Sequence, residues 1–160
     1  MLHRTIHHTI KYPVIRYVGN KTLGYVSDLH LERNKTMKPV VPVVSDYLAL
    51  CGDIGDPFHK SYKELLTFAS LNFEKTFLVS GNHEYDGSRS SDKIDDKLGN
   101  ICGNLNNVHF LNSDRMELDG YVILGTTLWT PRNIASIKTN GATYTFNETL
   151  NLKINFHHHN

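Results

Sequence analysis

The sequence has few cysteines, little net charge and no long apolar run, and each scarcity excludes a class of protein. Its two cysteines, Cys51 and Cys102, form no C-x-x-C pair, which argues against a zinc ribbon or a thioredoxin-type site. No segment reaches the roughly 20 apolar residues of a membrane-spanning helix. A net charge of +1 gives no basic field for nucleic acid, and the lysines and arginines form no stripe. We therefore expect a soluble, cytoplasmic protein without a membrane or nucleic-acid partner, of open oligomeric state.

Length and composition are those of one folded domain. A chain of 160 residues can bury a substantial core, and a 39% hydrophobic and 21% charged composition is typical of a globular rather than a disordered protein. Because no repeat or linker divides the chain, we expect a single domain over residues 1–160. Residues 1–13 are predicted to form a loose polar arm, and residues 132–160 a weakly patterned tail.

Short apolar runs and two helical patterns alternate along the chain. Strands are predicted over Val14–Val18, Thr22–Ser27, Asp46–Cys51, Thr76–Ser80, Val108–Leu111 and Tyr121–Trp129. A first helix is predicted to start at Asp56-Pro57, with the carboxylate as its cap, and a second to span about 91–102. Residues 112–120 are rich in turn formers and are predicted to be a turn. This order predicts a layered α/β protein.

Three of the predicted strands are followed by residues that suit a metal ion. Asp28 and His30 follow the strand at 22–27, Asp53 follows the next one, and Asn82 and His83 follow the strand at 76–80. In open α/β sheets, ligands gather outside the carboxyl ends of the strands. Carboxylate, imidazole and amide ligands form a hard, mixed N/O set that suits Mn, Fe, Zn or Mg. The repetition therefore predicts a site for divalent metal ions.

Such a site would suit phosphoryl chemistry. Two cations roughly 3.5–4 Å apart, bridged by a carboxylate, are the usual clamp for phosphoryl transfer, and they lower the pKa of a bound water. His83 lies next to Asn82 in the sequence, where an imidazole can protonate a departing alkoxide. The residues thus favour a hydrolase with a dinuclear metal centre.

In this order, the motifs resemble the first three signatures of the calcineurin-like metallophosphoesterases. The matching motifs are Asp28-Leu29-His30, Gly52-Asp53 and Gly81-Asn82-His83-Glu84. The similarity covers the chain from about residue 22 to residue 129. It implies the family fold, a layered β-sandwich flanked by helices in four layers (αββα), here incomplete at the C-terminus. It also implies hydrolysis of a phosphomonoester or phosphodiester through a metal-bridging hydroxide.

The resemblance also assigns roles to individual residues. It implies that Asp28 and His30 bind a first metal, that Asp53 bridges both metals and that Asn82 binds the second. His83 would be the catalytic acid and would also contact the phosphate. The implied partner is a phosphate-ester substrate of undetermined identity.

The last third of the chain departs from that family. The family completes its metal sites with three further histidines, two of them in a Gly-His-x-His motif that this sequence lacks. His157-His158-His159 is a late histidine cluster with no strand or glycine before it, and we interpret it as a tail rather than as replacement ligands. Two alternatives stay open: a shortened, weakly active or inactive member that acts as a metal-binding or interaction protein, or a fragment of a longer reading frame.

Other polar residues near the motifs have simpler interpretations. Glu84 and Tyr85 are predicted to form a wall of the loop. Arg89 is interpreted as a solvated loop residue rather than a phosphate contact, His109 as a satisfied core or surface histidine, and Cys51 as buried and inert.

Overall fold

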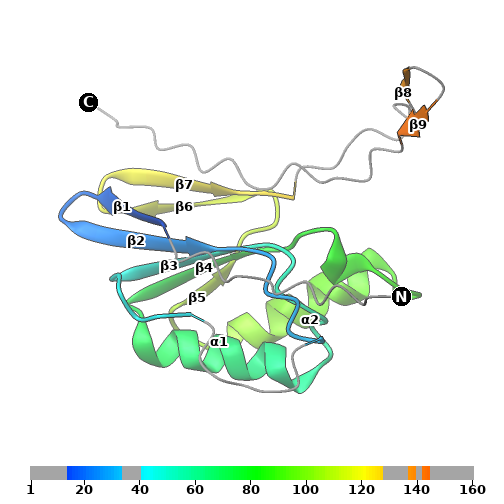
Figure 1. Ribbon diagram of the computed structural model, residues 1–160. Helices are drawn as coiled ribbons and strands as arrows, with labels where there is room; N and C mark the ends of the chain where they lie inside the picture. The colour runs from blue at the N-terminus through cyan, green and yellow to red at the C-terminus, as the bar shows by residue number, and fades with distance from the viewer. Residues whose placement is uncertain (1–13, 34–40, 128–136, 140–141, 145–160) are drawn as a thin grey trace, which may run out of the picture.

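The computed structural model describes residues 14–33, 41–127, 137–139 and 142–144. Its strands are β1 (Val14–Val18), β2 (Lys21–Val26), β3 (Tyr47–Cys51), β4 (Lys75–Val79), β5 (Val108–Phe110), β6 (Asp114–Leu118), β7 (Tyr121–Gly125), β8 (Ile137–Thr139) and β9 (Ala142–Tyr144). Its helices are α1 (Lys60–Asn72), α2 (Ser91–Gly103) and the short 3₁₀ helix η1 (His83–Tyr85). The chain is therefore a mixed α/β protein, as the sequence predicts (Figure 1).

The main sheet places the ends of its strands at one edge. Its strand order is β1-β2-β3-β4-β5. β1 pairs antiparallel with β2, whereas β2, β3, β4 and β5 pair parallel. Because the parallel strands point the same way, the loops that follow β2, β3 and β4 leave the sheet at a common edge.

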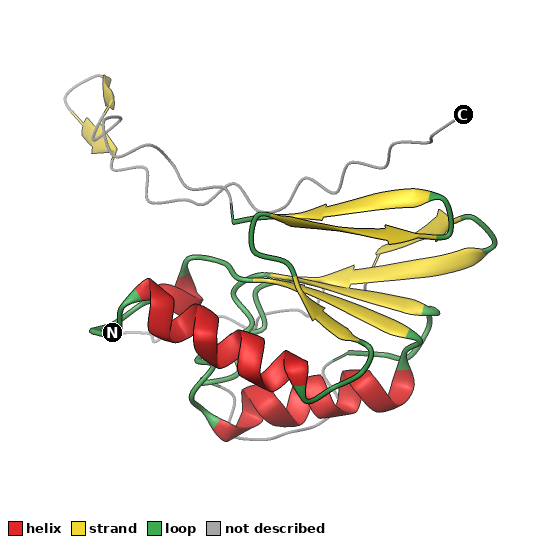
Figure 2. Cartoon of the chain, turned by 180° about the vertical axis from the view of Figure 1, so that it is seen from behind, coloured by secondary structure: helices red, strands yellow, loops and turns green. Residues whose placement is uncertain are grey.

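The two faces of this sheet are covered differently. Helices α1 and α2 lie on one face and the antiparallel hairpin β6–β7 on the other (Figures 1 and 2). Alternate residues of β3 serve the two cores: Leu48 and Leu50 face the helices, and Tyr47, Ala49 and Cys51 face the hairpin. All five are buried, which confirms the prediction of a continuous apolar strand covered on both sides.

The helices have the predicted apolar faces, but α1 begins later than expected. Its N-cap is His59, whose side chain accepts a hydrogen bond from the Ser61 amide. The carboxylate of Asp56 instead accepts from the Phe58 amide at 2.9 Å, so the prediction of Asp56 as the cap is wrong. The helix residues buried against the sheet include Tyr62, Leu65, Leu66 and Ala69 of α1 and Ile94, Leu98 and Ile101 of α2. Within the described ranges, no helix is both long and apolar enough to cross a membrane.

The prediction of a turn over residues 112–120 is wrong, because most of this segment is strand β6. Leu118 is buried under the main sheet, but Asp114, Arg115 and Glu117 are exposed, so the segment lacks an apolar signal. The turn itself is short: Asp119 and Gly120 both have positive φ, at 50° and 79°. Trp129, the arm at 1–13 and His157-His158-His159 lie outside the described residues.

Candidate metal centre

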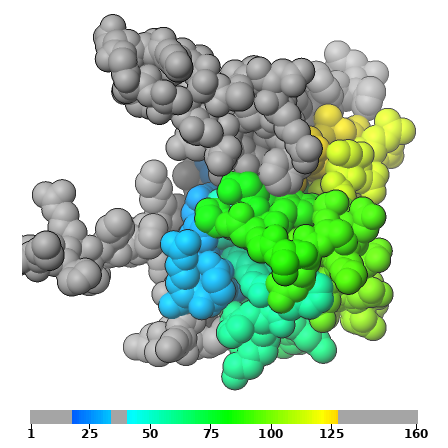
Figure 3. Space-filling model, turned by 90° about the vertical axis from the view of Figure 1, so that its right-hand side faces the viewer, coloured from blue at the N-terminus to red at the C-terminus, as the bar shows by residue number. Residues whose placement is uncertain are grey.

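The loops that follow β2 and β3 are hydrogen-bonded to one another beyond the sheet. The amides of Asp28 and His30 donate to the carbonyls of Gly52 and Asp53, both at 3.1 Å. The Leu31 amide continues the series with a 2.9 Å bond to Ile54. On the molecular surface, the blue segment around β2 and its loop borders the green segments (Figure 3). The backbone therefore brings the first two motifs together.

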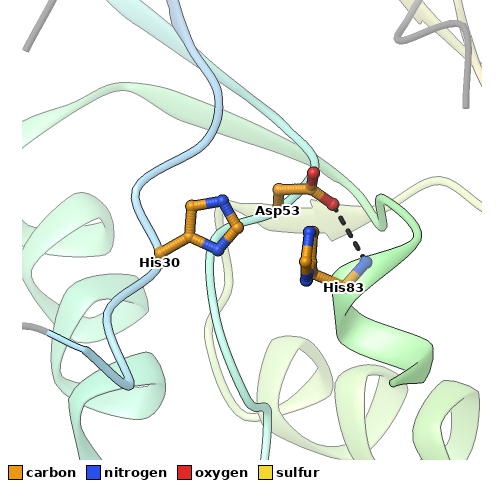
Figure 4. A group of neighbouring side chains, drawn as sticks. All are labelled: His30, Asp53 and His83. Atoms are coloured by element: carbon orange, nitrogen blue, oxygen red, sulfur yellow. Dashed lines mark hydrogen bonds between the residues drawn. The ribbon is translucent and has the colours of Figure 1, made fainter. Parts of the chain in front are cut away.

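Three predicted site residues form one compact group. His30, Asp53 and His83 each offer a ligand atom, and these atoms all lie within 4.8 Å of one another. The two imidazole rings meet edge to face, with their centroids 4.6 Å apart (Figure 4). The side chain of Asp53 is 5% exposed, and its Oδ1 accepts a 3.0 Å hydrogen bond from the His83 amide. The structure thus joins one residue from each of the three motifs.

The backbone at this edge adopts an uncommon conformation. Asp28, His30 and Asp53 have φ values of 59°, 44° and 54°, in the left-handed region that non-glycine residues rarely occupy. Such conformations cost of order 1–3 kcal/mol each and are retained where the surrounding structure demands them. Three such residues therefore lie in the loops that follow β2 and β3, two of them in the group of three donors.

Two glycines allow the loops after β3 and β4 to touch. A Cβ atom on Gly81 would lie 2.1 Å from Oδ1 of Asp53, and one on Gly52 would lie 2.8 Å from the Cα of Gly81. No side chain fits at such distances. Gly52 also has a φ of 87°, which favours glycine. The glycine of each motif is therefore needed for the close approach that forms the group.

Each imidazole of the group has a carboxylate beside its Nδ1 atom. His83 Nδ1 lies 2.8 Å from Asp86 Oδ2, and His30 Nδ1 lies 3.4 Å from Glu32 Oε1. A carboxylate on Nδ1 fixes the orientation of an imidazole and directs its Nε2 atom to a metal or a substrate. The 2.8 Å contact of His83 has hydrogen-bonding length, whereas the 3.4 Å contact of His30 Nδ1 is not a hydrogen bond, so only Asp86 can orient its imidazole in this way. The sequence interpretation did not identify Asp86 or Glu32, although each lies within three residues of a motif histidine.

The prediction that Glu84 forms a wall of the loop is wrong. Its side chain is 2% exposed and accepts hydrogen bonds from backbone amides of both neighbouring loops. Burial is the main reason that the pKa of Glu84 is raised, and the amides of Ile54 and Gly81 oppose this effect. Its position directly after His83 was the available signal, but sequence spacing does not show which amides a carboxylate reaches.

Asp28 is not among the grouped histidine and carboxylate donors, and Asn82, an amide, is not a donor of that kind. The Asp28 side chain is exposed and its carboxylate accepts a hydrogen bond from the Ser27 hydroxyl. Asn82 directly precedes η1, and its backbone carbonyl accepts a 3.0 Å hydrogen bond from the Tyr85 amide. Asn82 directly precedes His83 and Asp28 lies two residues before His30. The roles of both as metal ligands stay predictions.

The other polar candidates have structural roles. Arg89 pairs with Asp56 at 3.3 Å, and its guanidinium lies 4.2 Å from the ring centroid of Phe58. Cys51 is buried, as predicted, and burial raises the pKa of its thiol to about 12. His109 is half-buried, and its buried Nε2 atom has no hydrogen-bond partner within the described part of the chain, so the prediction of a satisfied histidine is wrong for this atom.

The donor set of the group fits a divalent metal ion. Two imidazole nitrogens and one carboxylate oxygen, mutually within 4.8 Å, are ligands that suit Zn²⁺, Fe²⁺ or Mn²⁺. The described residues contain one such group, and its three donors leave room in a coordination sphere for water or a substrate. The chemistry available at this edge is therefore that of an open metal site.

Comparison with known proteins gives a relative without an assigned function. No family model matches the chain. The chain is similar to the uncharacterized protein L509 of Acanthamoeba polyphaga mimivirus, with 36% identity over 143 residues. The match covers 80% of this chain and 50% of the viral protein, so the chain spans about half the length of that relative.

Proposed function

We propose that this chain is a metal-dependent phosphoesterase of the calcineurin-like kind. The observation that carries the proposal is the group formed by His30, Asp53 and His83 at the carboxyl ends of three neighbouring parallel strands. Each residue comes from one of the three motifs that resemble that family. The proposal includes the four-layer αββα sandwich, in which the β6–β7 hairpin is part of the second sheet.

The proposed metal centre uses all of the predicted ligands. With His83 reserved as the acid, Asp28, His30 and Asp53 would hold one divalent ion, and the family resemblance adds a second, which Asp53 and Asn82 would hold. A divalent ion supplies Lewis acidity toward a phosphate ester and lowers the pKa of a bound water. His30 and Asp53 would hold such an ion, and the 3.1 Å hydrogen bond from the His30 amide to the Asp53 carbonyl keeps the two residues together.

His83 is the proposed catalytic acid. Asp86 lies 2.8 Å from its Nδ1 atom, so Nδ1–H can donate to the carboxylate and Nε2 is the nitrogen that can carry a proton to the departing oxygen. The His83 side chain is 33% exposed, compared with 13% for His30, so solvent reaches it more readily. In this reaction a water oxygen forms the new P–O bond, and the leaving alkoxide takes its proton from His83.

A second candidate is a metal-binding protein that turns over little or no substrate. The observation that favours it is the size of the group, since the described residues bring together three donors of this kind. The sequence also lacks the Gly-His-x-His motif with which the family completes its centre. Loss of ligands or of their supporting partners reduces metal affinity or activity by about 10–100-fold.

Metal content and hydrolysis of an aryl phosphodiester distinguish these functions. The purified chain is loaded with Mn²⁺, its metal content is measured, and release of 4-nitrophenol from bis(4-nitrophenyl) phosphate is followed. The phosphoesterase proposal expects turnover that requires Mn²⁺ and is lost in His30→Ala and Asp53→Asn. His109→Gln is the matched control, because it removes a histidine outside the group. Stoichiometric metal without turnover would support the second candidate, and turnover that survives Asp53→Asn would contradict the first.

A further inference from the structure

We infer that the buried carboxylate of Glu84 is a positioning residue that fixes Asp53 and Gly81 in the geometry of the metal group. The inference has a structural part, which concerns the two loops, and a metal-binding part, which rests on the proposed function. Glu84 is not itself placed among the metal ligands, because it lies outside the group of three donors.

The carboxylate of Glu84 accepts hydrogen bonds from backbone amides of both loops. Its Oε2 atom accepts from the amides of Asp53 at 3.0 Å and Gly81 at 2.8 Å. Its Oε1 atom accepts from the amides of Ile54 at 2.7 Å and Gly55 at 3.4 Å. One oxygen thus joins the loop after β3 to the loop after β4, and the other secures the two residues that follow Asp53.

The charge of Glu84 is stabilised by these amides. Within the described part of the chain, the ion pairs involve other acidic residues, and no lysine, arginine or histidine pairs with Glu84. A buried carboxylate without a cation is costly unless several donors satisfy it, and four backbone amides do so here. The four hydrogen bonds therefore offset the cost of burying Glu84, and they join the two loops.

Two of the residues whose amides bind Glu84, Asp53 and Gly81, are closely confined by the backbone and side chains around them. Asp53 has a φ of 54°, and its Oδ1 atom lies against Gly81, where no side chain fits. Without a shared acceptor, the Asp53 and Gly81 amides would point into a buried region without a partner, which costs about 1–3 kcal/mol for each group. The loops would relax apart, and Asp53 would leave the position that it shares with His30 and His83.

A tyrosine links the same carboxylate to the helical layer. The hydroxyl of Tyr62 on α1 lies 3.4 Å from Oε1 of Glu84, and the Tyr62 side chain is fully buried. At this distance the contact is weak, so most of the positioning comes from the four amides. Tyr62→Phe removes the hydroxyl alone and should change the site far less than Glu84→Gln.

The test compares Glu84→Gln with Asp95→Asn in the full chain. Glutamine has the same shape as glutamate, but its NH₂ group cannot accept from the amides on that side. Asp95 belongs to a neighbouring network, in which it accepts hydrogen bonds from the side chains of Tyr85 and Asn112. Mn²⁺ affinity is measured by calorimetry, and the Co²⁺-loaded protein is compared by visible absorption. Backbone amide spectra and hydrogen exchange report on Asp53 and Gly81.

The expected result is a 10–100-fold weaker Mn²⁺ affinity and a changed Co²⁺ spectrum in Glu84→Gln, with little change in Asp95→Asn. The Asp53 and Gly81 amides should also lose exchange protection in Glu84→Gln alone. Unchanged affinity and unchanged protection in a folded Glu84→Gln would overturn the inference.

Two further outcomes are also decisive. If Glu84→Gln does not fold, the same measurements are made on Tyr62→Phe, and the amide proton shifts of Asp53 and Gly81 are read in the wild-type protein. Downfield amide protons at Asp53 and Gly81, as expected for carboxylate acceptors, would support the inference, and ordinary shifts would overturn it. If the wild type binds no Mn²⁺ or Co²⁺, the proposed function fails, and the exchange comparison still decides whether Glu84 positions the loops.

Discussion

The backbone amide of His83 donates a 3.0 Å hydrogen bond to Oδ1 of Asp53, so the loops after β3 and β4 are joined at the centre of the candidate site. The same oxygen is the atom that a side chain at Gly81 would meet, at 2.1 Å. Asp53 is thus a metal-ligand candidate and also a contact between two loops. Changes at Asp53 and Gly81 should therefore separate the stability of the fold from the affinity for metal.

Asp53→Asn should stabilise the metal-free protein while abolishing its response to metal. The amide oxygen of asparagine can still accept from His83. Burial and, more weakly, the charge of Asp53 raise the pKa of Glu84, and removal of that charge relieves the repulsion between the two carboxylates. We expect a gain of about 0.5–1 kcal/mol without metal. Thermal unfolding with EDTA and with Mn²⁺ measures both effects, and an equal Mn²⁺-induced rise in Tm in mutant and wild type would contradict the prediction.

Gly81→Ala should damage the site, whereas Gly99→Ala should not. A Cβ atom at Gly81 would overlap Asp53, and overpacking of this kind costs about 1–3 kcal/mol. Gly99 lies within α2 with no atom near its Cβ position, so alanine there should stabilise the helix by about 0.5–1 kcal/mol. Urea denaturation and Mn²⁺ titration of both variants provide the comparison. A Gly81→Ala protein with wild-type Mn²⁺ affinity would show that the loops have room to separate without loss of the site.

The fold could be predicted where burial leaves a pattern in the sequence. β3 is apolar at every position because the helices cover one of its faces and the β6–β7 hairpin covers the other. The second helix shows its buried face at helical spacing for the same reason. β6 gave no such pattern, because it buries Leu118 but leaves Asp114, Arg115 and Glu117 in solvent. An edge hairpin that covers a sheet with a few side chains resembles a turn in sequence.

The sequence predicted the three residues that meet at the candidate site, but it did not predict the residue that positions their loops. Parallel strands bring their carboxyl ends to one edge, so the sequence order of the motifs was enough to expect that His30, Asp53 and His83 would meet. The role of Glu84 depends on amides about 30 residues away in the chain, at Asp53 and Ile54. Such a contact depends on how closely two loops approach, and residue types alone do not encode that distance.

Loss of the His83 imidazole should affect substrates with poor leaving groups most. A positioned acid contributes about 10²–10⁴-fold when the departing oxygen needs a proton, and much less when 4-nitrophenolate departs. We expect His83→Gln to lower kcat strongly for an alkyl phosphate ester and weakly for a 4-nitrophenyl ester. Asp86→Asn should reproduce part of this loss, since Asp86 orients Nδ1 of His83. Equal losses for both substrates, together with a lower metal content, would show that His83 acts as a ligand instead.

His109 should make the fold less stable in mild acid. Burial and, more weakly, the nearby charge of Lys75 lower the pKa of His109 below its ordinary value of 6.5. The unfolded chain therefore binds a proton at this residue at a higher pH than the folded chain does. Stability that is present above pH 6.5 should fall as the pH drops toward the folded pKa, and below that value the loss should be complete.

His109→Phe should remove this contribution and preserve the stacking on Phe77, whose ring centroid lies 6.1 Å from that of His109. We expect the dependence of unfolding free energy on pH between about 5 and 7 to be shallower in His109→Phe than in the wild type. Urea denaturation at several pH values provides the measurement, and the other histidines contribute equally to both proteins. Parallel curves for the two proteins would contradict the prediction. They would show that His109 has the same pKa in the folded and unfolded wild-type chain, although its Nε2 atom is buried in the structure.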